Sequence, residues 1–130
     1  MPKFTITPIP KPRMTRSDKW NERPVVLRYR AFRSELQKQS IDLGFSIGQA
    51  VRIIFFIPMP DSWTNKKKAE MDGLPHQQTP DIDNLQKAVL DSLLPDNDSA
   101  VWFVCAVKVW SYNGSINIHN LTLAETSKIL

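Results

Sequence analysis

The sequence predicts an α+β domain in which a mixed sheet of four strands carries its helices on one side, in the order β-α-β-α-β-β. Residues 51–57 and 101–110 are β-branched and aromatic runs of the kind found in strands. Apolar residues recur at helical spacing over 24–43 and 82–94. Because 130 residues suit one domain, we expect a single domain over residues 1–130.

The composition is that of a globular protein in a reducing compartment. Hydrophobic residues make up 42% and charged residues 23% of the chain, which is ordinary for such a protein. No stretch approaches the ~20 apolar residues of a membrane span, and the start lacks the long apolar run of a secretory signal. Cys105 is the single cysteine and the two histidines are far apart, which excludes an intramolecular disulfide and does not favour a zinc site. We expect a cytoplasmic protein with no membrane partner.

The charge is unevenly distributed along the chain. Residues 1–33 hold nine Lys or Arg against two acids, a net +7, whereas residues 70–98 hold seven acids against one lysine, a net −6. One region therefore attracts anions and the other attracts cations. A polyanion whose phosphates meet a metal ion would satisfy both.

The chain begins with an expected strand over 3–9 and then a basic proline-rich loop over 10–23. The prolines of this loop cannot donate to a strand ladder, so we expect an extended surface segment. Four cations surround Trp20, which suggests an arm that grips phosphates and stacks an aromatic ring. The alternative is a solvated basic loop whose tryptophan packs in the core. The four cations are Lys11, Arg13, Arg16 and Lys19.

Pro24 suits the first turn of a helix, and Gly44 is the expected stop. The apolar stripe between them consists of Val25, Tyr29, Phe32, Leu36 and Leu43. Three arginines lie off the stripe and are read as solvent-facing or as DNA contacts: Arg28, Arg30 and Arg33. The next strand, over 49–57, is almost continuously apolar, so we expect it to be covered on both faces.

A basic connecting segment over 58–80 follows. Ser62 is the expected cap of a short helix that stops at Asp72-Gly73. Its three adjacent lysines cannot share one helix face, so we expect a diffuse electrostatic role toward DNA or plain solvation. They are Lys66, Lys67 and Lys68. His76 is read as a surface loop residue, with a catalytic role as the alternative.

The expected helix over 82–94 is the most acidic part of the chain. Five of the nineteen residues from Pro80 to Asp98 are carboxylates. Asp81 stands at the helix start and Asp83 lies in the first turn, so two carboxylates share one helix mouth. Like charges ~4 Å apart repel by about 4 kcal/mol at an effective dielectric of about 20, which favours a raised pKa or a bound cation. Hard oxygen ligands suit Mg²⁺ or Mn²⁺.

The rest of the chain supplies two strands and a third carboxylate. A core strand is expected over 100–110, and Asn113-Gly114 signals a hairpin to a returning strand over 115–123. Cys105 is read as a buried packing residue. If the strand over 100–110 pairs beside the strand over 49–57, Asp98 can return to the helix start. Three carboxylates would then hold one or two divalent ions.

Lys87 lies one helical turn beyond Asp83. It could stabilise negative charge in the transition state of phosphodiester cleavage or orient the attacking water. It could equally form a simple ion pair with Asp83 or Asp91.

The string Asp81-Ile82-Asp83-Asn84-Leu85-Gln86-Lys87, followed by Asp98 with Val101 beyond it, resembles the signature of the RusA family of Holliday junction resolvases. The segments 10–16 and 62–76 also resemble phage-type members, so the similarity covers nearly the whole chain. This resemblance implies a homodimeric, magnesium-dependent endodeoxyribonuclease of bacteria, prophages or phages. A two-fold dimer would match the near two-fold symmetry of a four-way DNA junction.

Carried over residue by residue, the resemblance implies metal ligation by Asp81, Asp83 and Asp98, with Lys87 as the essential cation. The family often has adjacent acids at the downstream site, whereas Asn97 precedes Asp98 here. Asp96 therefore stays open as a substitute ligand, and the part of Asp91 also stays open.

Three functions are consistent with these observations. The first is resolution of Holliday junctions by paired symmetric nicks, in DNA recombination and repair. The second is a metal-dependent nuclease for flaps, forks or other branched DNA. The third is a DNA-binding accessory protein whose acids are only solvated or structural. The first function predicts that Asp83→Asn keeps junction binding and loses cutting.

Overall fold

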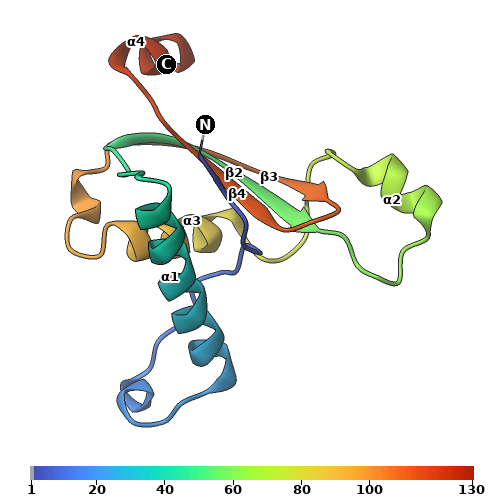
Figure 1. Cartoon of the computed structure of the whole chain (residues 1–130), viewed down its shortest axis with the longest axis horizontal. Coiled ribbons are helices and arrows are strands. Elements are labelled where there is room, and N and C mark those ends of the chain that lie inside the picture. Colours follow the sequence, from blue (N-terminus) through green and yellow to red (C-terminus); the bar gives the residue numbers. More distant parts are fainter. Residues whose placement is uncertain (1) are drawn as a thin grey trace.

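The computed structural model describes residues 2–130 and confirms an α+β domain with one mixed four-stranded sheet. The strands lie in the order β1-β4-β2-β3, and α1 and α3 pack together beside the sheet (Figure 1). The strands are β1 (Lys3–Phe4), β2 (Ala50–Pro58), β3 (Phe103–Ser111) and β4 (Ser115–Asn120). The α-helices are α1 (Pro24–Asp42), α2 (Asn65–Met71), α3 (Ile82–Leu93) and α4 (Leu123–Ile129), with 3-10 helices at Arg16–Lys19 and Asp98–Ala100.

One face of the sheet forms the core with α1 and α3. Alternate residues of β2 are buried, and the residues between them are half-buried. The expectation that this strand is covered on both faces is therefore wrong, because the helices cover only one of them. The alternation follows from the period of two along a strand. The core residues of β2 and β4 are Val51, Ile53, Phe55, Ile57, Ile116 and Ile118.

The sheet places β2 between β3 and β4. β2 runs parallel to β3 and antiparallel to β4, so the predicted hairpin between the last two strands is wrong. The segment 112–114 crosses the end of β2 instead. A Cβ on Gly114 would lie 2.6 Å from the Thr7 hydroxyl oxygen and 2.7 Å from the Thr7 Cα, so glycine permits a close backbone approach rather than a two-residue turn.

The helices begin and end close to their sequence signals. α3 matches its predicted range within one residue, and Gly44 follows α1 with φ of +62°, as the helix stop requires. The buried face of α1 includes Val26 rather than Val25, and Leu43 is exposed. The cap of α2 is Thr64, whose side chain accepts from the Lys67 amide, and not Ser62.

Both ends of the chain differ from expectation. The first strand comprises only Lys3–Phe4, since the chain leaves the sheet before Pro8. The last predicted strand stops at Asn120, and α4 follows, capped by Thr122 with Glu125 in a capping box. No helix within residues 2–130 is long and apolar enough to cross a membrane.

Candidate active site

The start of α3 presents two exposed carboxylates and one exposed lysine. Asp81 is the N-cap residue, and within the described chain its side chain makes no capping hydrogen bond, so its carboxylate remains free for another ligand. Asp83 lies in the first turn, and its Oδ2 is 3.8 Å from the Lys87 Nζ. Both of those side chains are about two-thirds exposed, at 66% and 64%. This loose ion pair is weak in water and leaves carboxylate oxygens accessible.

Lys108 fixes the segment that delivers Asp81 to this position. Its Nζ donates to the carbonyl oxygens of Gln78 (2.5 Å) and Pro80 (2.7 Å). The backbone N–H of His76 donates to the Lys108 carbonyl at 3.0 Å. The approach to α3 is therefore attached to β3 by both the side chain and the backbone of one residue. Sequence reasoning missed this lysine, although it is the only charged residue in the run 101–110.

Asp91, on the same helix, has a different environment. It accepts a hydrogen bond from the Tyr29 hydroxyl and lies 3.3 Å from the Lys11 Nζ and 3.7 Å from the Arg33 Nε. Burial acts to raise the pKa of Asp91, but the Tyr29 hydrogen bond and the positive charges of Lys11 and Arg33 outweigh it, so the pKa is lowered. These contacts join α1, α3 and the N-terminal segment, and we assign Asp91 to that structural role.

Asp98 lies at the other end of α3. It begins the 3-10 helix Asp98–Ala100, and the Asn97 amide donates to the Leu94 carbonyl at the end of α3. Twelve helical residues rise by about 18 Å. The orange segment after α3 accordingly lies away from the yellow segment that enters it (Figure 1).

The structure therefore does not bring the three predicted ligands together in one chain. Among residues 2–130 there is no group of three His, Cys, Asp or Glu side chains that could hold a metal ion. The predicted pairing of β3 beside β2 is present, but β3 is parallel to β2. The helix between two parallel strands runs back along them, so residues before and after α3 lie at opposite ends of the sheet.

Two carboxylates still suit a magnesium ion, which commonly takes one or two carboxylates together with substrate phosphates. Asp81 and Asp83 supply such a pair, and Asp98 with Asp96 is at the far end of the helix. Metal ligation by these residues remains a prediction.

The basic N-terminal loop is held in place by one buried carboxylate, Asp18, which is 4% exposed. Arg23 donates to it twice, from Nε to Oδ1 and from Nη2 to Oδ2, both at 2.8 Å. The Thr15 amide donates to Oδ2 at 2.6 Å. The Arg23 hydrogen bonds, followed by that of the Thr15 backbone, lower the pKa of Asp18 well below its usual range.

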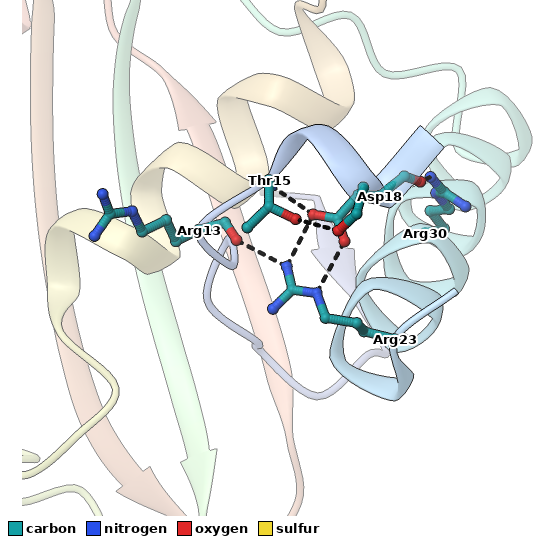
Figure 2. Close-up of polar contacts among 6 residues, drawn as sticks. Arg13, Thr15, Asp18, Arg23 and Arg30 are labelled. Atoms are coloured by element: carbon teal, nitrogen blue, oxygen red, sulfur yellow. Dashed lines mark hydrogen bonds and ion pairs between the residues drawn. The ribbon is translucent and has the colours of Figure 1, made fainter. Parts of the chain in front are cut away.

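This cluster connects the loop to α1 (Figure 2). Arg23 also donates to the Arg13 carbonyl at 2.9 Å, and Arg30 donates to the Asp18 carbonyl at 3.0 Å. The guanidinium of Arg13 extends away from Asp18 (Figure 2). The loop is therefore ordered by its own contacts, while cationic side chains remain on its surface.

The predicted DNA-binding residues fall into two groups. Arg13, Arg16 and Lys19 are exposed, and Trp20 is 71% exposed, so the alternative that this tryptophan packs in the core is wrong. Lys11 is instead paired with Asp91. DNA contact by the exposed group remains a prediction.

The α2 region carries the other predicted cations, and one of them, Lys67, lies on an aromatic stack. Trp63 lies 4.7 Å from Trp110, and the Lys67 Nζ lies 4.2 Å above the Trp63 ring. Lys66 and Lys67 are exposed, whereas Lys68 is half-buried. The three lysines therefore do not form one face, as the sequence predicted.

His76 is not the surface loop residue that the sequence suggested. It is 4% exposed and its ring lies 4.3 Å from the Trp110 ring. Burial, followed by the positive charge of Lys108, lowers the pKa of His76. A neutral imidazole in this place is part of the packing between β3 and the connecting segment.

Nearly all of these features lie within the part of the chain that matches a known family. The family model of the endodeoxyribonuclease RusA matches residues 4–119. The chain belongs to the RusA family. No curated protein sequence matches the chain.

The RusA match includes the basic loop, the aromatic stack and both ends of α3, and only α4 among the helices lies outside it. The family is one of endodeoxyribonucleases, which supports nuclease activity for this chain. Besides Lys108, sequence reasoning missed the parts of Asp18 and Tyr29. Asp18 offered one signal, since Thr15 three residues before it forms a capping-box pattern.

Proposed function

We propose that this RusA family member is a magnesium-dependent endodeoxyribonuclease, also able to use Mn²⁺, that resolves Holliday junctions by paired symmetric nicks. Its role would be in DNA recombination and repair, in the bacterial cytoplasm or during phage growth, and it would act as a homodimer. One observation carries the proposal. The start of α3, inside the family match, exposes Asp81 and Asp83 without a capping or buried ion-pair role.

The proposed chemistry follows from these exposed groups. Asp81 and Asp83 would hold the divalent ion, which would lower the pKa of a bound water and shield phosphate charge. Lys87, 3.8 Å from Asp83, would place a positive charge near the scissile phosphate, where charge develops in the transition state. The Asp18 and Asp91 carboxylates already pair with neighbouring arginines and a lysine, so these groups would orient the chain rather than react.

The proposed DNA contacts are the exposed cations of the N-terminal loop, with Lys66, Lys67 and Lys68 adding a diffuse positive field. Phosphate contacts of this kind would position the protein and would select junction shape more than base sequence. Trp20 would stack on an exposed base beside the loop, since a base–aromatic contact tolerates any sequence.

The experiment is digestion of end-labelled linear, forked and mobile four-way DNA by the parent protein, with and without Mg²⁺. We expect symmetric nicks in opposite strands of the four-way junction when Mg²⁺ is present and no nicks when it is absent. Equal or faster cutting of forks would instead indicate a nuclease for other branched DNA. Binding of all branched DNA without nicks would indicate an accessory protein and would contradict the proposal.

A further inference from the structure

A cavity of about 630 Å³ lies on the face of the sheet opposite α1 and α3. It is lined by Phe56, which alternates with the core residues of β2, and by its cross-strand partner Ser115. Asn117 lies two residues after Ser115 and pairs with Lys3, so both point to this face as well. The volume is within the range of roughly 300–1,000 Å³ that is usual for ligand sites.

Two segments enclose the cavity at the end of β2. One is the N-terminal segment 5–7, and the other is the segment 112–114, which crosses from β3 to β4. They approach so closely that a Cβ on Gly114 would lie 2.6 Å from the Thr7 hydroxyl oxygen. This contact fixes both walls, so the cavity is formed before any ligand binds, as most ligand sites are.

The lining suits a ligand that has a flat ring, polar edges and a negative charge. Phe56 and Tyr112 supply aromatic rings, and Tyr112 is 53% exposed. Ser115 is only 5% exposed, and the Asn117 Oδ1 is buried without a hydrogen-bond partner among residues 2–130. Buried polar atoms are normally hydrogen-bonded, so the fold leaves part of the capacity of this amide unused. Within the described chain, Lys3 is the only charged residue of the lining.

Two paths along the chain limit the distance from the cavity to the start of α3. Ser111 of the lining follows Lys108, which fixes the approach to α3, by three strand residues or about 10 Å. Thr7 precedes Lys11, whose amide donates to the Asn84 carbonyl in the first turn of α3, by four residues or at most about 14 Å. These lengths equal about three or four nucleotide steps of 3.4 Å.

We propose that this cavity binds one unstacked nucleotide of the branched DNA, a few steps from the phosphate held at the start of α3. The base stacks on Tyr112, its polar edge bonds to Asn117 and Ser115, and Lys3 contacts the phosphate. Extruding a base costs least where its pairing is already disturbed, which is the case at a branch point. The inference rests on the proposed function, because the nucleotide belongs to the DNA substrate.

Photo-cross-linking tests the occupant without any cleavage. The first arm is a four-way junction with 5-iododeoxyuridine at successive positions near the branch point, irradiated with the parent protein in the absence of Mg²⁺. The second arm is free 5-iododeoxyuridine monophosphate. We expect the junction to label Tyr112, as located by mass spectrometry. Labelling by the free nucleotide alone would overturn DNA as its source, and labelling of Tyr112 by neither would overturn the site.

A matched pair of variants tests the stacking. Tyr112→Ala should lower junction affinity at least about fivefold, since it removes one base–aromatic contact. Tyr112→Phe keeps the ring and should bind as the parent does. Circular dichroism checks that both variants are folded. Equal affinity of the parent protein and both variants would overturn the stacking.

The salt dependence of binding tests the phosphate contact. Lys3→Ala should reduce the slope of log affinity against log salt by about 0.7–0.9, the value for one phosphate. Lys128→Ala is the control, because Lys128 is exposed on α4, which lies beyond the opposite end of β4 (Figure 1). Its slope should equal that of the parent. An unchanged slope in Lys3→Ala would remove this lysine from the site.

Cleavage of a pool of junctions with random bases near the branch point separates this inference from the proposed function. Asn117→Leu removes an amide oxygen that has no partner in the fold and keeps a similar shape, so the variant should fold. We expect the parent protein to cut at preferred sequences and the variant to show at least about a fivefold weaker preference. The same preference in both proteins would overturn the base contact alone, whereas a parent protein that cuts no junction would refute the proposed function.

Discussion

The carboxylates of this protein differ in their hydrogen-bond partners and in their exposure to solvent. Asp18 and Asp91 accept hydrogen bonds from arginine, tyrosine or backbone donors, and their pKa values are lowered. Asp83 is 66% exposed with one lysine 3.8 Å away, whereas the side chain of Asp91 is 27% exposed. The acidic helix therefore has two kinds of carboxylate: Asp91 holds α1, α3 and the N-terminal segment together, whereas Asp81 and Asp83 stay accessible to a cation.

Removing the Asp91 carboxylate should reduce the free energy of unfolding more than removing the Asp83 carboxylate. Asp91→Ala leaves the buried Tyr29 hydroxyl without its acceptor and separates Lys11 and Arg33 from their counter-charge. We expect a loss of about 1–3 kcal/mol in the free energy of unfolding, measured by urea denaturation. Asp83→Ala is the matched control on the same helix and should stay within about 0.5 kcal/mol of the parent. Equal losses in the two variants would remove the distinction between these carboxylates.

Acidification should also reduce the free energy of unfolding, by a smaller amount, because it protonates Asp91. The folded pKa of Asp91 is lowered, and the unfolded value is about 3.9. Its stabilisation is therefore complete above the unfolded pKa and is lost as the pH falls through the folded pKa. The stability difference between the parent and Asp91→Asn should be constant near neutral pH and should shrink below about pH 4. A difference that stays constant to pH 2 would show that the charge of Asp91 contributes nothing.

The sequence predicted most of the fold because its local signals were strong. α3 has an apolar face, an acidic start and a proline before it, and its range is correct within one residue. The hairpin prediction failed because Asn113-Gly114 reports a local turn and cannot reveal that β2 lies between the strands it connects. α4 was missed because its seven residues are too few for a clear helical period.

The predicted site residues are in part neighbours in the fold and in part far apart, and their roles remain predictions. Asp81 and Asp83 share a helix start by sequence proximity alone, so their exposure at one place follows from local structure. The position of Asp98 depends on the direction of α3 relative to the parallel strands, which is a property of the whole fold. The same is true of Asp91, whose partners Lys11 and Tyr29 are far away in sequence.

The most direct test of the central claim compares Asp83→Asn with the parent protein in single-turnover cleavage of a four-way junction at saturating Mg²⁺, with junction affinity measured on the same samples. Asparagine keeps the shape of the side chain and removes its charge. We expect cleavage to fall by roughly 100-fold or more, as when one electrostatic group is removed from an active site, with affinity unchanged. Cleavage at the parental rate would contradict the assignment of catalysis to the start of α3.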